Sequence, residues 1–352
     1  MTLRLRSAAR WWTVRIGYAA RADHWPSLES QRRRVANKVG RVTAETGRGL
    51  GTAARRMMLV HAHPDDETIN NGVTMAKYVA EGAEVCLVTC TLGEEGEVLV
   101  DDLSHLAADQ GDELGQHRLG ELKRAMDILG VTDFVRLGGD GRFRDSGMAY
   151  ADSGHAIART ELREGIFWTT DLLEATNELV PLIRQRRPHV LITYNEFGGY
   201  GHPDHVQAHR VAMYGYLLAG VPSYRNDLGP AWTVPRVLWT TMSRNRMLEA
   251  IRRLREAGDT ETFEGFDPDG PFMSLISSDE EIAAAIDGTR YTARKLDAMR
   301  AHATQITADG PFFAGAAILG DSMWSQEFYR LAAGQPFPQA DRWADDLFAG
   351  LN

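Results

Sequence analysis

The sequence predicts an α/β fold in which a mostly parallel sheet is flanked by helices. Short apolar runs alternate with segments whose apolar residues recur at helical spacing, the pattern of strands buried between layers of helices. The apolar runs 56–60 and 189–194 are each followed by His-Pro-Asp and then by a helical pattern. Both should therefore end at the same edge of one sheet, the edge at which open α/β sheets bind ligands.

The strands are predicted from their apolar runs. We expect them at 56–60, 84–91, 133–137, 189–194 and 237–242. Right-handed crossovers between parallel strands would bring their carboxyl ends to one edge. The acidic exit of the second strand, 93–97, would then lie beside the two His-Pro-Asp motifs.

The helices are predicted from the spacing of their apolar residues and from their end signals. We expect them at 68–82, 107–129, 171–187, 204–218 and 279–303. Gly82 and Gly130 close the first two, and Pro188 punctuates the third. We interpret the polar stretch 149–170 as an insertion or lid, 266–271 as a turn-rich link and 312–329 as a closing segment.

Composition and cysteine spacing restrict the class of protein. The chain has 352 residues, of which 43% are hydrophobic and 25% charged, ordinary values for a globular protein. No run approaches 18 apolar residues, so we expect no transmembrane segment. Cys86 and Cys90 would lie roughly 13 Å apart in an extended run, too far for a mutual disulfide. A reducing cytoplasm is the expected compartment.

Charge is distributed unevenly along the chain. Residues 1–56 contain 13 Lys and Arg against 3 Asp and Glu, a net charge of +10, whereas the remainder carries −19. We expect a basic, poorly ordered N-terminal extension over 1–56. It could precede a true start at Met57 or Met58, or act as a targeting arm, a membrane-surface segment or a nucleic-acid contact.

The stretch 60–67 reads Val-His-Ala-His-Pro-Asp-Asp-Glu and follows the first predicted strand. Pro64 has no N–H for a ladder and favours an extended backbone at His63, so the chain leaves the sheet here. The His63 imidazole and the carboxylates of Asp65 and Asp66 are ligand types that suit zinc. One carboxylate could bind the ion while its neighbour takes a proton from water. The alternative is that Asp65 or Asp66 only N-caps the following helix.

The second cluster, 198–205, reads Gly-Gly-Tyr-Gly-His-Pro-Asp-His. Together the two clusters could bring three ligands to a single ion, and catalytic zinc takes three protein ligands and keeps one position open. Gly198, Gly199 and Gly201 permit positive φ and close backbone approach, which a site loop or an ordinary turn would use.

These motifs resemble the zinc-dependent N-acetylglucosaminide deacetylases related to the glycosylphosphatidylinositol-anchor deacetylase, also described as LmbE-like. The paired metal motifs are specific to this superfamily. A narrower resemblance, to the N-acetylglucosaminyl-inositol deacetylases of mycothiol biosynthesis, is carried by 89–98, 144–148, 299–305 and 309–313. The resemblance implies a Rossmann-like sheet with a smaller C-terminal α/β portion completing the site. We accordingly assign 57–334 to a deacetylase catalytic domain and 335–352 to a C-terminal tail.

The resemblance also implies the metal ligands and the base. His63, Asp66 and His205 would bind one Zn²⁺ per chain, with Fe²⁺ as another occupant of the same ligands. Asp65 would be the general base for the attacking water.

Oxyanion stabilisation would come from the second cluster. Tyr200 and protonated His202 would stabilise the tetrahedral oxyanion. Asp204 would orient His202 and raise its pKa, or N-cap its helix, and these two roles are compatible. Asp65 and His202 both remain candidates for the general acid that protonates the leaving amine.

Substrate contacts are implied at three further positions. Arg118 and Asp145 would face the inositol ring, and Glu97 would contact sugar hydroxyls or tune the site. The alternatives are a surface ion pair for Arg118 and a solvated acidic loop for Glu97. His302 could belong to the site, but a single His on a helix is more often structural.

The implied reaction is zinc-dependent hydrolysis of the acetamide of N-acetylglucosaminyl-inositol to glucosaminyl-inositol and acetate, a cytoplasmic step of mycothiol biosynthesis. The alternatives are a mycothiol S-conjugate amidase, which shares both metal motifs, and a non-catalytic sugar- or metal-binding protein on the same fold. The acidic loop 93–97 favours the deacetylase, and the presence of every expected ligand and base disfavours the binding protein. We expect a small-molecule partner and no nucleic-acid partner.

Overall fold

The computed structural model describes residues 55–151, 155–260, 262, 274–338 and 342–351. The predicted extension lies almost wholly, and the predicted link at 266–271 lies wholly, outside the described residues. Among the described residues, no helix has both the length and the apolar composition needed to span a bilayer.

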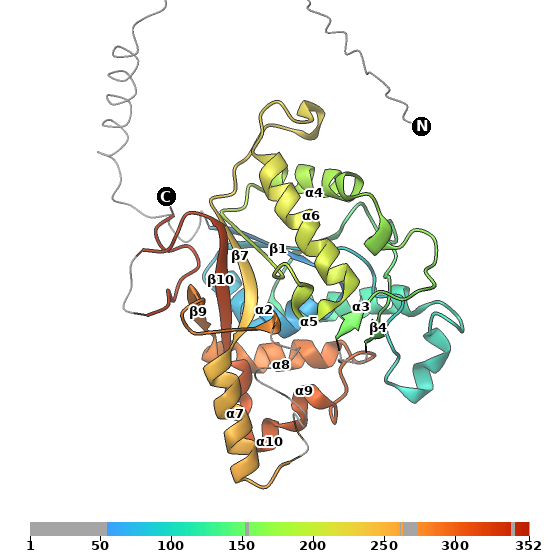
Figure 1. Cartoon of the computed structure of the whole chain (residues 1–352), viewed down its shortest axis with the longest axis vertical. Coiled ribbons are helices and arrows are strands. Elements are labelled where there is room, and N and C mark those ends of the chain that lie inside the picture. Colours follow the sequence, from blue (N-terminus) through green and yellow to red (C-terminus); the bar gives the residue numbers. More distant parts are fainter. Residues whose placement is uncertain (1–54, 152–154, 261, 263–273, 339–341, 352) are drawn as a thin grey trace, which may run out of the picture. The chain divides into compact units, whose positions relative to one another are not determined.

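A mixed, mostly parallel sheet forms the centre of the described chain (Figure 1). Its neighbouring strands, in order across the sheet, are β3 (Asp133–Arg136), β2 (Glu84–Thr89), β1 (Arg56–His61), β6 (Val190–Thr193), β7 (Arg236–Ser243), β10 (Gln326–Gly334) and β9 (Ala284–Asp287). The strands from β3 to β7 are parallel, and β10 is antiparallel to both of its neighbours. The short strand β8 (Ile276–Ser277) pairs with the end of β7. The predicted fold class is confirmed.

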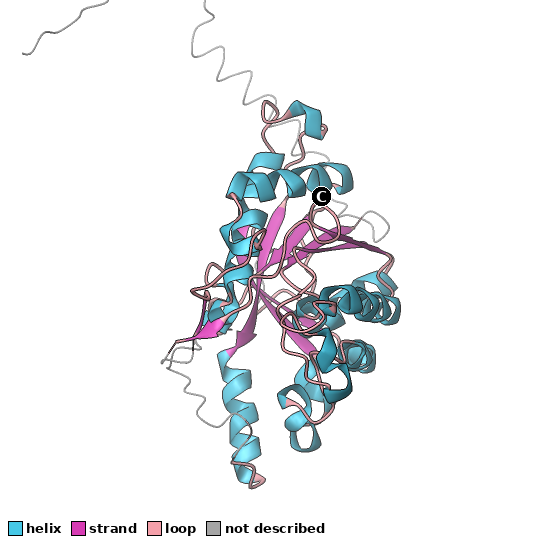
Figure 2. Cartoon of the chain, turned by 90° about the vertical axis from the view of Figure 1, so that its right-hand side faces the viewer, coloured by secondary structure: helices cyan, strands magenta, loops and turns pink. Residues whose placement is uncertain are grey.

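Helices cover both faces of this sheet (Figure 2). The side chains of β1 alternate between the two faces, as the twofold repeat of a strand requires. Met57 and Leu59 pack in one core cluster and Met58 and Val60 in the other. The first cluster contains side chains of α2 (Asp66–Ala80), α3 (Leu114–Leu129) and α8 (Thr292–Ala301), and the second those of α4 (Leu172–Arg186) and α6 (Pro203–Ala219).

The remaining elements are shorter or lie at the border of the sheet. They are the antiparallel pair β4 (Ala149–Tyr150) and β5 (Ala156–Ile157), the 3-10 helices η2 (Asp101–Leu106), η3 (Phe167–Thr169), η4 (Asn226–Leu228), η6 (Thr289–Tyr291) and η7 (Asp321–Trp324), and the helices α5 (Gly198–Gly201), α7 (Arg244–Glu256), α9 (Pro311–Ala314) and α10 (Ala316–Leu319). In its described residues, the segment predicted as an insertion or lid therefore contains the pair β4–β5 and η3. Cys86 and Cys90 are free and buried, as expected from their spacing along the chain.

Two of the predicted helices are wrong over part of their length. The helix predicted at 107–129 begins only at Leu114, because Asp112 takes a positive φ of 55° that no helix can contain. The helix predicted at 279–303 is divided into β9 and α8. The run Ala284–Asp287 has high helix propensity, but pairing with β10 determines its structure.

The chain near its C-terminus is part of the core. We predicted a tail over 335–352, but Leu347, Phe348 and Leu351 are buried in the same cluster as Met57 and Leu59. Arg236 is fully buried and donates to the carbonyl oxygens of this region, including that of Leu347 at 2.7 Å. These apolar contacts and hydrogen bonds anchor the segment to the sheet.

Candidate metal centre and active site

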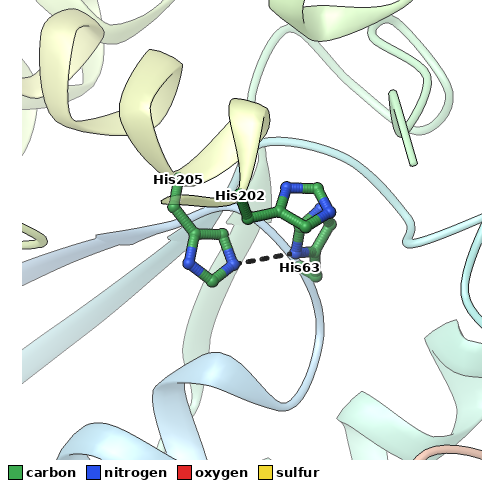
Figure 3. Close-up of side chains that lie close together, drawn as sticks. All are labelled: His63, His202 and His205. Carbon is green, nitrogen blue, oxygen red and sulfur yellow. Dashed lines mark hydrogen bonds between the residues drawn. The ribbon is translucent and has the colours of Figure 1, made fainter. Parts of the chain in front are cut away.

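The two His-Pro-Asp motifs meet at the carboxyl edge of the sheet. His63 follows β1 directly, and His205 lies in the first turn of α6, which follows β6. Because β1 and β6 are neighbouring parallel strands, both turns lie above the same edge. The Nδ1 atom of His63 is 3.3 Å from Nε2 of His205 (Figure 3).

His63, Asp66 and His205 form a compact triangle of possible ligands. An Asp66 oxygen is 3.3 Å from His63 Nδ1, and its other oxygen is 3.3 Å from His205 Nε2. Two atoms that each bind a tetrahedral zinc at about 2.05 Å lie about 3.3 Å apart. The spacing of the two imidazole nitrogens is therefore what one zinc ion would require, and Asp66 faces each of them with a different carboxylate oxygen.

The other nitrogen of each imidazole faces a hydrogen-bond acceptor. His205 Nδ1 lies 3.2 Å from the Gly198 carbonyl oxygen, and His63 Nε2 lies 3.3 Å from an Asp204 oxygen and 3.4 Å from one of Asp145. In the metal-free chain, burial lowers the pKa of His63, but Asp145, Asp204 and Asp66 outweigh it and raise this pKa well above its ordinary value. When both imidazoles are neutral with protons on the outer nitrogens, the two inner nitrogens are both acceptors and cannot bond to each other. A cation between them would satisfy both, and such outer acceptors are typical of imidazoles that bind a metal.

Two other groups in the described part of the chain could hold an ion. One is His63, His202 and His205, and the other is His63, Asp145 and Asp204, with the ligand atoms of each group within 4.8 Å of one another. Their additional members have hydrogen-bond partners, as Asp66 also does, since its Oδ2 accepts from the His63 N–H at 3.0 Å. His202 Nδ1 accepts from the Asp204 N–H at 3.1 Å, and the two carboxylates accept from backbone N–H groups. Asp66 is the carboxylate whose two oxygens face the two imidazoles.

Asp65 has a different environment from its neighbour Asp66. It precedes the first residue of α2, but its side chain makes no capping hydrogen bond, so the alternative of a simple N-cap does not hold for it. Its carboxylate lies 3.1 Å from the guanidinium of Arg118. Burial raises the pKa of Asp65 to about 6, although Arg118 opposes the rise. A carboxylate with a pKa near neutrality is well suited to take up and return a proton.

Arg118 lies beside Asp65 and is only 2% exposed. Besides Asp65, its guanidinium donates to the carbonyl oxygens of Gly93, at 2.9 Å, and Pro64. The alternative of a surface ion pair is therefore excluded. The expected contact with inositol stays a prediction, because Arg118 is not among the residues that line the cavity described below.

The predicted relation between Asp204 and His202 is wrong. The Asp204 carboxylate accepts from the backbone N–H of Ser146 at 2.8 Å and from the Ser146 hydroxyl, and it faces His63. The N-cap of α6 is His202, through its Nδ1, and not Asp204. Burial, together with the positive charge of His63, lowers the pKa of His202 well below its ordinary value instead of raising it. With Nδ1 occupied as an acceptor, the proton of a neutral His202 is on Nε2.

Tyr200 lies on α5, where three glycines shape the loop. Its ring centroid is 5.1 Å from that of His205 and 6.2 Å from that of His202. Burial raises the pKa of the Tyr200 phenol, which keeps it a hydrogen-bond donor. A Cβ atom at Gly201, where φ is +101°, would lie 2.7 Å from the Ala156 carbonyl oxygen, so the close approach expected of this loop is present.

A polar cavity of about 520 Å³ adjoins the cluster. Asp145, Ser146 and Glu97 are among the residues that line it. Burial alone would raise the pKa of Asp145, but nearby His63 holds it well below the ordinary value. Asp145 therefore stays an ionised acceptor, and the cavity volume is within the range typical of small-molecule sites.

Three residues near the site were not among the predicted site residues. Ser146 holds Asp204, and the ring of Tyr194 stacks on His205 with centroids 4.3 Å apart. Glu67 accepts from the backbone N–H of Asp65. The sequence pointed to these residues only through their position in the chain. Ser146 lies in the segment 144–148, Glu67 lies in the segment 60–67, and Tyr194 ends an apolar strand.

The chain belongs to the PIG-L family of deacetylases: residues 58–215 match the family described as "PIG-L: GlcNAc-PI de-N-acetylase", and highly similar relatives cover more of the chain. Among the chain's relatives are three proteins named 1D-myo-inositol 2-acetamido-2-deoxy-alpha-D-glucopyranoside deacetylase. The one from Kribbella flavida is 60% identical over 84% of this chain and 98% of its own length. The relative from a Nocardioides species is 56% identical over 85% of this chain and 100% of its own length. The relative from Geodermatophilus obscurus is 53% identical over 85% of this chain and 99% of its own length.

Solved structures share the fold at low sequence identity. The N,N'-diacetylchitobiose deacetylase of Pyrococcus horikoshii aligns with a TM-score of 0.53 at 18% identity, covering 88% of this chain and 94% of its own. GalB, a 4-carboxy-2-hydroxymuconate hydratase of Pseudomonas putida, aligns with a TM-score of 0.51 at 14% identity, covering 81% and 99%. Because these two names describe different reactions, the shared fold alone does not define an activity.

Proposed function

We propose that this chain hydrolyses the acetamide of 1D-myo-inositol 2-acetamido-2-deoxy-α-D-glucopyranoside, giving the free amine and acetate. The observation that carries this proposal is the 60% identity to a protein named for that reaction, over 98% of that protein's length. The sequence resemblance supports a step in mycothiol biosynthesis, and the cytoplasm is its proposed compartment. We also propose that 57–334 contains the catalytic machinery, so a chain beginning at Met57 should retain activity.

We propose zinc as the metal, held by His63, Asp66 and His205. The mutual spacing of 3.3 Å and the outward-facing acceptors support this ligand set. When bound, zinc would polarise the amide carbonyl and lower the pKa of a water molecule at the site. Fe²⁺ could occupy the same ligands, and metal analysis of anaerobically purified protein would distinguish the two.

Asp65 is the proposed general base and acid. It takes a proton from the attacking water as the water oxygen bonds to the carbonyl carbon, and it returns a proton to the leaving nitrogen as the C–N bond breaks. Its pKa of about 6 suits both transfers. Arg118 forms an ion pair with this carboxylate at 3.1 Å.

His202 and Tyr200 are the proposed donors to the oxyanion. A neutral His202 whose Nδ1 accepts from the Asp204 N–H presents Nε2–H as a donor. The Tyr200 hydroxyl, on a ring 6.2 Å from that of His202, is proposed as a second neutral donor, and such donors stabilise negative charge as it develops. In this arrangement Asp204 orients His63, a ligand, through the contact at 3.3 Å.

We propose that the cavity beside Asp145 receives the polyol part of the substrate. An ionised carboxylate can accept from two hydroxyl groups at once, and Asp145 lies between the cluster and the cavity. Glu97 also lines this cavity, which supports the proposed contact with the substrate. For Arg118 we propose an indirect role through Asp65.

The test is acetate release from the N-acetylglucosaminyl-inositol by purified protein with zinc. Acetate and the free amine should form in equal amounts. A mycothiol S-conjugate in the same preparation should give a lower kcat/KM, and a higher value would favour the amidase. Protein that binds metal in a 1:1 ratio and releases no acetate from any N-acetylglucosaminide would contradict the proposal.

A further inference from the structure

The backbone of Asp65 has a conformation that few residues adopt. Its φ is +118° and its ψ is −36°, whereas the next residue begins a regular helix. A non-glycine residue in such a sparsely populated region costs about 1–3 kcal/mol and persists only where the surroundings hold it. The Asp65 N–H donates to Glu67 Oε2 at 2.9 Å, and this hydrogen bond fixes the peptide that precedes the carboxylate.

Glu67 is itself held by a residue from the far end of the sequence. Its Oε1 accepts from the hydroxyl of Thr68 at 2.6 Å and faces Nε2 of His302 at 3.1 Å. Glu67 and His302 are both fully buried. His302 follows α8 directly, so a turn 235 residues away in sequence completes the environment of the proposed base.

The same turn contacts two further parts of the site. The N–H and hydroxyl of Thr304 donate to the buried carboxylate of Glu121 at 2.9 and 2.7 Å. Glu121 lies on α3 one turn beyond Arg118, the partner of Asp65. Gln305 donates to the Glu97 carbonyl oxygen at 3.0 Å. The turn 302–305 is therefore linked to the base through Glu67 on one side and through α3 on the other.

We propose that Glu67 and His302 form a positioning pair that holds Asp65 in its unusual backbone conformation and so aims its carboxylate. The inference rests on the proposed function, because it assigns a role in the reaction attributed to Asp65. Neither residue is placed to touch the substrate. The N–H donated by His302 fixes the Glu67 carboxylate, whose second oxygen then fixes the Asp65 peptide.

A second buried carboxylate provides a matched comparison. Glu327 also accepts from backbone N–H groups of α2, those of Val73 at 3.1 Å and Thr74 at 2.9 Å, and it also pairs with a basic residue of α8, Lys295, at 2.7 Å. Val73 is eight residues beyond Asp65, about 12 Å along a helix. The pair Glu327–Lys295 therefore links α2 to α8, as Glu67 and His302 do, but it contacts α2 about 12 Å from Asp65.

The experiment compares His302→Leu, His302→Gln and Glu327→Gln in the full-length, zinc-loaded protein. His302→Leu removes the donor, so kcat should fall about 10- to 100-fold, with KM and bound zinc within about twofold of wild type. His302→Gln keeps an N–H donor and should recover most of kcat. Glu327→Gln should lower the unfolding midpoint but leave kcat within about twofold of wild type.

Amide hydrogen exchange gives a readout that does not depend on turnover. The Asp65 N–H should exchange faster in His302→Leu than in wild type, and at the wild-type rate in Glu327→Gln. If wild type releases no acetate, the proposed function fails, while exchange at Asp65 still decides whether the pair holds this peptide. A folded His302→Leu protein with wild-type kcat and Asp65 exchange overturns the inference, as does His302→Gln that is no better than His302→Leu.

Discussion

Replacing Asp65 with Asn should abolish turnover and stabilise the metal-free protein. Burial raises the pKa of Asp65 from 3.8 to about 6, with Arg118 opposing the rise. A difference of this size disfavours the ionised form by about 3 kcal/mol at pH 7, an upper limit because the side chain keeps 16% solvent exposure. Asn has a similar shape, carries no charge and tolerates positive φ. We expect the free energy of unfolding to rise by about 1–3 kcal/mol at pH 7.

The sign of this effect depends on pH. The pKa of Asp65 is higher in the folded state than in the unfolded state, so the wild type loses stability as the pH rises from about 4 through about 6. Asp65→Asn lacks this loss, so the stability difference between the two proteins should be near zero at pH 4 and largest at pH 7. Urea unfolding of chelator-treated proteins at several pH values measures it.

The turnover of Asp65→Asn should fall although its free energy of unfolding rises. Loss of a general base lowers kcat about 100- to 10,000-fold, measured as acetate release. Zinc stoichiometry should stay at the wild-type value, because Asp65 makes none of the three 3.3 Å contacts, whereas the control Asp66→Ala should lose zinc. An Asp65→Asn protein that loses its zinc, or is less stable than wild type at pH 7, would refute the reasoning.

Three other perturbations test separate parts of the structure. His205→Ala should weaken zinc binding by more than about 100-fold, because it removes a ligand and not merely an orienting residue. Competition with a chelating dye measures the zinc affinity. An unchanged affinity would exclude the proposed ligand set. Burial, helped by Arg56, lowers the pKa of His189 to about 4, so an NMR titration should give a pKa well below 6. The free energy of unfolding should then fall as the pH drops from 6.5 toward 4, and His189→Gln should remove that fall. A measured pKa near 6.5 would contradict this prediction. Arg184 donates to six backbone carbonyl oxygens, including that of Tyr224 at 2.8 Å. Arg184→Met should therefore lower the free energy of unfolding in urea by about 3–5 kcal/mol. A decrease below about 1 kcal/mol would show that water replaces these hydrogen bonds.

The parallel part of the fold was predictable because its signals are local. Apolar runs such as 56–60 and punctuation such as Gly82 and Gly130 define strands and helices without knowledge of their partners. The antiparallel border was not predictable in this way. Two of the four residues of the strand Ala284–Asp287 are alanine, and pairing with β10 gives it an extended structure.

The position of the site was also predictable, since two strands with the same exit motif must meet if they are neighbours. The hydrogen bonds around it were not. Asp204 is next to Pro203 and close to His202 in sequence, but the start of α6 directs its carboxylate to Ser146 and His63. The link from His302 to Glu67 spans 235 positions, and no local pattern contains it.

The burial of Leu347, Phe348 and Leu351 beside Met57 and Leu59 has a consequence for biosynthesis. A ribosome that adds roughly 5–20 residues per second needs about 15–60 s to pass from Met57 to Leu351. During that time one face of the first strand lacks part of its apolar cover. The nascent chain is therefore exposed to aggregation and to chaperone capture until Leu351 has been synthesised.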